Sequence, residues 1–256
     1  MPVLFVGHGS PMNAIEDNQW SRGFRALGES LPRPRAILAI SAHWYVPGTY
    51  VTSNDHPETI HDFGGFPQEL YAVHYPAPGS LSLAARVSRL IASVPCTGSS
   101  EWGLDHGTWS VLRSVRPQAD FPVVQLSIDH RLPPEGHWRI GRELAPLREE
   151  GVLIMGSGNV THNLGHVMRS IYEGRKSTPA WARDFDADVA RALEQHDGDY
   201  LLRALESDAG RSSHPTPDHW LPILYAAGAS TADDAVSFPI AGFEAGSLSM
   251  RAVRLG

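Results

Sequence analysis

Residues 36–44 read Ala36-Ile37-Leu38-Ala39-Ile40-Ser41-Ala42-His43-Trp44. The first six form a short, uncharged and largely apolar run, which is typical of a strand buried within a sheet. Similar runs recur at Val3 to Val6, Thr49 to Thr52, Phe121 to Ile128 and Val152 to Met155. We therefore expect these segments to form the strands of one sheet.

Segments with helical spacing lie between these runs. They are Trp20 to Leu27, Leu81 to Ile91, Trp109 to Val115, Gly136 to Glu149, Pro179 to Gln195 and Leu221 to Ala227. Alternating strands and helices predict an α/β fold in which helices flank a central, mostly parallel sheet. We expect one domain over residues 1–256, because single domains of about 200–250 residues are common.

The composition excludes several classes of protein. Of the 256 residues, 42% are hydrophobic and 19% are charged, and the formal net charge is −7. This apolar share is enough for a packed core and argues against disorder driven by charge. Because the balance is negative and Lys and Arg do not cluster, neither nucleic acid nor a membrane surface is an expected partner. The apolar runs are too short to span a membrane and the first residues do not resemble a signal peptide, so we expect a cytoplasmic protein.

The cysteine count limits the possible metal ligands. Cys96 is the single cysteine, so neither an internal disulfide nor a zinc site made of several thiolates can form. Any metal must therefore be held by His, Asp or Glu, and the chain contains 13 histidines.

Histidines follow three of the predicted strands. His8 comes after the run Val3 to Val6, His43 after Ala36 to Ser41, and His162 a few residues after Val152 to Met155. Parallel strands place their carboxyl ends at one edge of a sheet, where open α/β folds bind ligands. A single histidine after a strand is usually only a hydrogen-bonded loop residue. Three at one edge favour a cleft that binds a divalent ion and moves protons.

Two long segments without clear periodicity, Asp55 to Gly79 and Ser207 to Asp218, read as loops that form the walls of a site. The second leads into His214-Pro215-Thr216-Pro217-Asp218-His219-Trp220, where two prolines fix φ and limit the freedom of both histidines. A surface turn with incidental histidines is the structural alternative.

Seven short motifs together resemble one enzyme family. They are Gly7-His8-Gly9-Ser10-Pro11, Ser41-Ala42-His43-Trp44, Asp62-Phe63-Gly64-Gly65-Phe66-Pro67, Tyr75-Pro76-Ala77-Pro78-Gly79, Gly103-Leu104-Asp105-His106-Gly107-Thr108-Trp109, Thr161-His162-Asn163-Leu164 and His214-Pro215-Thr216-Pro217-Asp218-His219. In this order they resemble the DOPA-dioxygenase branch of the class III (LigB-type) extradiol ring-cleavage dioxygenases. The resemblance runs from residue 1 to about residue 250.

The resemblance implies a non-haem Fe(II) enzyme that binds a catechol through both hydroxyls and inserts both atoms of O₂ beside them. By motif, His8, His43 and His219 match the family's metal ligands. His162 matches an acid/base that is a fourth ligand in some zinc-loaded forms, and His106 matches a histidine that hydrogen-bonds substrate or activated oxygen. His214 matches a residue that lines the same pocket.

The chemistry of the residues agrees with these roles. Three protein ligands leave open positions for a bidentate catechol and for O₂. The usual open iron site has two histidines and one carboxylate, whereas the third ligand implied here is His219. This difference brings the site closer to the three-histidine pattern of catalytic zinc, so Zn(II) is a plausible ion in the purified protein.

Aromatic residues beside the proposed ligands could hold a planar substrate. Trp44 and Phe66 are expected in the pocket lining, with Tyr71 and Trp220 near them, and core packing explains any one of these rings equally well.

Two other functions stay open at this point. A three-histidine site could activate water in a zinc hydrolase, and the scaffold could bind metal without catalysis. Nucleotide binding is disfavoured, because Gly156-Ser157-Gly158 lacks the Lys-Ser/Thr of a phosphate-binding loop, and neither Ser10 nor Ser157 matches Gly-x-Ser-x-Gly.

Overall fold

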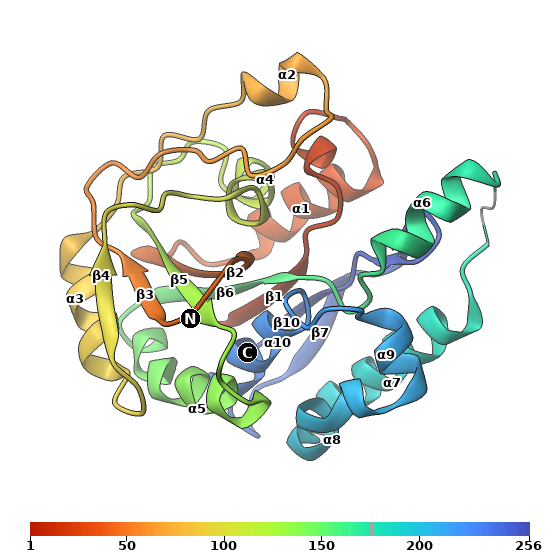
Figure 1. The fold of residues 1–256 in the computed structure, drawn as a ribbon. Coiled ribbons are helices and arrows are strands. Elements are labelled where there is room, and N and C mark those ends of the chain that lie inside the picture. Colours follow the sequence, from red (N-terminus) through yellow and green to blue (C-terminus); the bar gives the residue numbers. More distant parts are fainter. Residues whose placement is uncertain (175–176) are drawn as a thin grey trace.

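The computed structural model describes residues 1–174 and 177–256, and its centre is an eight-stranded sheet (Figure 1). The strand order is β4-β3-β5-β2-β6-β1-β10-β7. The strands are β1 (Val3–Gly7), β2 (Ala36–Val46), β3 (Thr49–Thr52), β4 (Cys96–Ser99), β5 (Val123–Asp129), β6 (Val152–Gly158), β7 (Val236–Ile240) and β10 (Ala252–Leu255). The pairs from β5 through β2 and β6 to β1 are parallel, as is β3 with β4, whereas β10 pairs antiparallel with β1 and β7, and β3 antiparallel with β5. A small hairpin-like pair, β8 (Phe243–Glu244) and β9 (Leu248–Ser249), lies outside this sheet.

Helices cover both faces of the sheet. In Figure 1, α1 (Gln19–Ser30), α2 (Gln68–Tyr71) and α4 (His106–Val115) lie on one side, and α5 (Pro134–Leu144) and α10 (Leu221–Gly228) lie on the other. The remaining helices are α3 (Leu81–Leu90), α6 (Leu164–Tyr172), α7 (Ala180–Glu194), α8 (Gly198–Arg203) and α9 (Asp208–Ser213), with short 3₁₀ turns at Pro11–Ala14, Ala145–Arg148 and Ala204–Glu206.

The central strands β1, β5 and β6 are buried at every position because both of their faces are covered. Along β1, Val3 and Phe5 join the core on the α5 and α10 side, whereas Leu4 and Val6 join the core on the α1 and α4 side. Side chains of a strand alternate between the two faces, so a strand between two helical layers needs an unbroken apolar run. The α/β fold with a mostly parallel sheet is thereby confirmed.

The predicted elements differ from the observed ones mainly at their ends. All six predicted helical segments are helical, but the segment 136–149 is divided between α5 and the turn Ala145–Arg148. β2 continues to Val46, so His43 and Trp44 lie within the strand rather than after it. The pairing of β2 with β5 is irregular between Ile40 and Tyr45, which lets the strand change direction at this point.

The two segments predicted as loops are not wholly irregular. Residues 55–79 contain the short helix α2, and residues 207–218 contain α9, which Ser207 caps by accepting the Gly210 N–H. The strands β4, β7 and β10 were not predicted. In the described part of the chain, no helix is both long and apolar enough to cross a membrane.

The register of the central strands sets the position of the site. Gly7 of β1 lies beside Gly158 of β6, and Ser157 of β6 lies beside Ser41 of β2. These three parallel strands are neighbours in the sheet, so the segments that follow them begin at nearly the same level. The ends of β1 and β6 and the middle of β2, from which the predicted histidines come, therefore lie at one edge of the sheet.

Candidate metal and catalytic site

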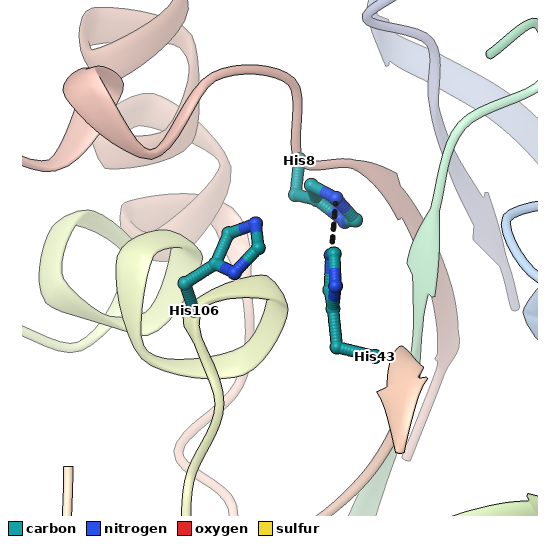
Figure 2. A group of neighbouring side chains, drawn as sticks. All are labelled: His8, His43 and His106. Carbon is teal, nitrogen blue, oxygen red and sulfur yellow. Dashed lines mark hydrogen bonds between the residues drawn. The ribbon is translucent and has the colours of Figure 1, made fainter. Parts of the chain in front are cut away.

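Three histidines from three separate elements face one another at this edge of the sheet. His8 follows β1, His43 lies in β2 and His106 is the first residue of α4 (Figure 2). Each offers a ring nitrogen within 4.8 Å of the others. His8 is 2% exposed and His106 is 6% exposed, so little water competes for these nitrogens.

The spacing of two of these nitrogens suits a common ion. The Nε2 atoms of His8 and His43 are 3.2 Å apart, as the dashed line in Figure 2 marks. Two nitrogens bound at about 2.0–2.1 Å to one tetrahedral ion would be about 3.3 Å apart. The two rings are therefore arranged as ligands of one metal ion would be.

His219 brings a third ring to the same place. Its ring centroid lies 5.2 Å from that of His8 and 5.0 Å from that of His43. Its Nε2 atom is buried and has no hydrogen-bond partner within residues 1–174 and 177–256. A buried polar atom without a partner is rare, and a metal ion would satisfy it.

The loop of His219 reaches the site through close backbone contacts. The Asn159 N–H donates to His219 O at 3.0 Å, and the His8 N–H donates to Gly158 O at 3.0 Å. A Cβ atom at Gly158 would lie 2.2 Å from His219 O, so only glycine permits this approach. The end of β6 thus holds the segments of both histidines together.

Ser157 orients the ring of His8. The Ser157 hydroxyl donates its proton to Gly107 O at 2.5 Å, and the same oxygen lies 3.0 Å from His8 Nδ1. A hydroxyl has one proton, so towards His8 it can only accept. His8 therefore carries its proton on Nδ1 and directs the lone pair of Nε2 into the site.

Carboxylates face the Nδ1 atoms of the other rings. Asp218 Oδ2 contacts His219 Nδ1. Asp62 contacts two rings, with 3.3 Å between Oδ2 and His43 Nδ1 and 3.0 Å between Oδ1 and His106 Nδ1. Partners of this kind fix the tautomer and the direction of metal-binding histidines.

Burial lowers the pKa values of His8, His43 and His219. Loss of hydration is the largest cause in each case, and it holds the pKa values of His8 and His219 well below their usual range. Burial, with His106 nearby, lowers the pKa of His43 to about 3, although Asp62 acts in the opposite direction. Burial alone would raise the pKa of Asp62, but its hydrogen bond from His106 and the nearby imidazoles lower it to about 2. Neutral imidazoles opposite ionised carboxylates are the forms that a metal ion requires.

His162 lies flat against His219. The two ring centroids are 3.4 Å apart and the ring planes differ by 3°. The His162 N–H donates to Ser213 O at 2.9 Å, which ties the segment after β6 to the last residue of α9. Burial is the main cause that lowers the pKa of His162 to about 4, so the ring is neutral at pH 7.

Comparison with known proteins assigns the chain to a protein family. Residues 2–245 match the family described as the catalytic LigB subunit of aromatic ring-opening dioxygenase. The chain belongs to the LigB family. It is 49% identical to the "4,5-DOPA dioxygenase extradiol" of Escherichia coli (strain K12), an alignment that covers 100% of this chain and 95% of the relative. It is also 38% identical to the protein of the same name from Beta vulgaris, over 89% of this chain and 86% of that one.

A solved structure agrees with this assignment to the LigB family. The crystal structure of an uncharacterized protein from Escherichia coli K12 superposes with a TM-score of 0.83 at 43% sequence identity, and the match covers 100% of both chains. The predicted family resemblance is therefore confirmed, and so is the prediction of a metal-dependent aromatic ring-opening dioxygenase.

The residues predicted to line the pocket of this LigB-family chain lie in different surroundings. Trp44 is 4% exposed and stacks on Trp102, with 5.5 Å between the ring centroids. Phe66 packs edge-on against Phe63, and Phe63 packs edge-on against His106 at 5.4 Å.

His214 is also buried, and its ring is held by the segment that follows β6. Its Nε2 donates to Val160 O at 2.8 Å, while its Nδ1 atom is buried and has no partner among the described residues. Trp220 and Phe185 pack around the same ring, with centroids 5.8 Å and 6.1 Å away.

Sequence reasoning missed the residues that orient the histidines. Asp62, Phe63 and Asp218 stood inside the quoted motifs without a role, and Ser157 was considered only as part of a phosphate-binding loop or as a nucleophile. The motifs themselves were the available signal for Asp62 and Asp218. Nothing local marks Ser157, because its partners Gly107 and His8 are far from it in the sequence.

Proposed function

We propose that this chain is an extradiol dioxygenase that opens a catechol-type, DOPA-like aromatic ring with O₂. The observation that carries the proposal is the convergence of the Nε2 atoms of His8 and His43, 3.2 Å apart, beside the unpartnered Nε2 of His219. Two relatives named "4,5-DOPA dioxygenase extradiol" align with this chain over most of their length, and their names support the substrate class.

His8, His43 and His219 are the metal ligands in this proposal, and the working metal is Fe(II). When bound, ferrous iron supplies the redox centre through which electrons pass from an aromatic diol to O₂. Zn(II) is the ion we expect in protein purified in air, because zinc outranks ferrous iron in the general order of affinities. The buried, neutral and nitrogen-only donor set fits either ion.

His162 is the general base in this proposal. Its neutral ring can take the proton of one diol hydroxyl, and its stacking on His219 places it directly beside a ligand. In a four-coordinate zinc form His162 would be the fourth ligand, because its ring lies directly beside that of His219.

His106 is the second catalytic residue. With its Nδ1 facing Asp62, its Nε2 is free to accept a hydrogen bond from substrate. The substrate ring is held by His214, Trp44 and Phe66 in this proposal. Phe66 reaches the site through Phe63, and the unpartnered Nδ1 of His214 is available to a polar group of the substrate.

Anaerobic reconstitution with Fe(II), followed by O₂ and a panel of catechols, tests this function. The expected result is O₂ uptake and a yellow ring-fission product with at least one DOPA-like catechol. His43→Ala should abolish the product, whereas His130→Ala changes an exposed histidine outside the site and should not. The proposal fails if iron-loaded protein consumes no O₂ with any catechol, and hydrolysis by a zinc-loaded sample would point to the alternative function.

A further inference from the structure

Asp62 is a single carboxylate placed between two histidines of the site. Its Oδ2 lies 3.3 Å from His43 Nδ1, and its Oδ1 lies 3.0 Å from His106 Nδ1. The same Oδ1 accepts the backbone N–H of His106 at 2.9 Å. The Asp62 side chain is 16% exposed, so water competes little for these contacts.

The first turn of α4 brings the two rings together. The ring centroids of His43 and His106 are 3.8 Å apart. A Cβ atom at Gly107 would lie 2.9 Å from His43 Cδ2 and 2.5 Å from Ser41 Oγ. The missing side chain at Gly107 therefore lets α4 approach β2 until one carboxylate can reach both imidazoles.

An ionised carboxylate accepts hydrogen bonds and cannot donate them. At 3.0–3.3 Å a bare Nδ1 lone pair would repel the carboxylate, so we assign a proton to the Nδ1 atom of each ring. A ring with this single N–H keeps the lone pair of its Nε2 atom. The Ser157 hydroxyl and the Asp218 carboxylate each face the Nδ1 atom of one ring, whereas Asp62 faces the Nδ1 atoms of two.

We propose that Asp62 is a positioning residue that sets the tautomer of a metal ligand and of the substrate-side histidine at the same time. Through His43 it determines metal affinity, and through His106 it determines how a bound diol is held. This inference rests on the proposed function, in which His43 binds the metal and His106 contacts substrate.

The variant Asp62→Asn separates the two roles. The amide oxygen should turn towards His106, which presents two N–H donors, namely its backbone N–H and Nδ1–H. The amide NH₂ must then face His43 Nδ1. Because the NH₂ group is itself a donor, a proton on Nδ1 would be repelled by it. His43 is expected to move its proton to Nε2, which removes the lone pair that binds metal, while His106 keeps its tautomer.

Metal affinity and histidine tautomers of the metal-free protein provide the test. Co(II) and Zn(II) affinities are measured by competition with a chromophoric chelator for the wild type, Asp62→Asn, Asp62→Glu and Asp120→Asn. We expect 10–100-fold weaker binding for Asp62→Asn, as for other partners of metal-bound histidines, and partial recovery for Asp62→Glu, which keeps an acceptor. Asp120→Asn changes an exposed carboxylate paired with Arg33 and should bind like the wild type.

Long-range ¹H–¹⁵N NMR correlations of the metal-free proteins report the tautomers directly, with His43→Ala used to assign the signals. The wild type should show His43 protonated on Nδ1, and Asp62→Asn should show it protonated on Nε2. If Asp62→Asn folds poorly, the metal affinity of Asp62→Glu and the histidine tautomers of the wild type test the inference instead.

Two results would overturn the inference. One is a wild-type His43 protonated on Nε2, and the other is a folded Asp62→Asn protein that binds Co(II) as tightly as the wild type. Failure of the wild type itself to bind either metal would instead contradict the proposed function. The two failures are therefore distinguishable.

Discussion

The rings of His162 and His219 are stacked, with 3.4 Å between their centroids and 3° between their planes. The stack places His162 directly beside one of the proposed metal ligands, where it would face a substrate bound at the site. Because burial lowers its pKa to about 4, the ring is unprotonated at neutral pH and has a lone pair free.

Replacing His162 should separate catalysis from metal binding. His162→Ala is expected to lower the turnover number about 10²–10⁴-fold, because general acid/base groups typically contribute this much. Metal affinity should fall only modestly, since the three proposed ligands stay in place. Steady-state kinetics at saturating Fe(II), together with chelator competition, measure both quantities.

His166→Ala is the matched control for this variant. His166 lies one turn further along, in α6, and its ring packs edge-on against Trp181 at 5.3 Å rather than in the site. The His166→Ala variant should retain near-normal turnover. Near-normal turnover of His162→Ala would mean that a different residue is the base.

Ser157→Ala should weaken metal binding without removing a ligand. Loss of the hydroxyl frees His8 Nδ1 and leaves Gly107 O without its donor, so the His8 ring is no longer held in one tautomer. Metal affinity is expected to fall about 10–100-fold. Ser230→Ala removes a similar hydroxyl bond to a backbone carbonyl, that of Ala227, and should have no such effect. Equal affinities of the two variants would show that Ser157 does not orient His8.

The identity of the bound metal should decide activity. Protein purified in air is expected to contain zinc or little metal and to have low activity, which anaerobic exchange with Fe(II) restores. Zinc has no accessible redox change and cannot pass electrons from a diol to O₂. Metal analysis paired with activity before and after exchange checks this expectation. Full catechol cleavage by an iron-free, zinc-loaded sample would contradict the iron mechanism.

The sequence predicted the centre of the fold better than its edges. β1 and β6 are buried on both faces, so their apolar runs are continuous and easy to recognise. β4 reads Cys96-Thr97-Gly98-Ser99 and is partly exposed, and β7 alternates and contains Pro239, so neither carries that signal. α9 was hidden for a similar reason, since its sequence, Asp208 to Ser213, has no apolar face of its own.

The site was predictable as a set of histidines but not as a network. His8, His43 and His162 follow or extend central strands, and a strand order of β2-β6-β1 brings them together. The contacts that orient the rings join residues far apart in the chain, such as Ser157 with His8 and Asp62 with His106. Short motifs describe neighbours in sequence, so these pairings require the folded structure.

A buried histidine outside the site predicts how stability depends on pH. The ring of His137 is fully buried under α10, with Nδ1 2.9 Å from the Tyr225 hydroxyl. Burial lowers its pKa to about 4, although the backbone of Leu132 and the charge of Asp129 act in the opposite direction. The unfolded chain has the ordinary pKa of about 6.5 and so binds the proton more readily between these two values. The stabilisation is fully present above pH 6.5 and is lost as the pH falls towards 4, by roughly 3 kcal/mol.

Urea unfolding of the metal-free protein between pH 7.5 and 4.5 measures this contribution when the wild type is compared with His137→Gln. Both proteins contain the buried histidines of the site, so the contributions of those residues cancel in the comparison. The wild type should lose about 2–3 kcal/mol more than His137→Gln as the pH falls, even though the variant starts from a lower stability. Tyr225→Phe removes the hydroxyl partner but keeps the titrating ring, and its stability should follow the pH dependence of the wild type. If the curves of the wild type and His137→Gln ran parallel over this range, His137 would not be the neutral buried group that the structure indicates.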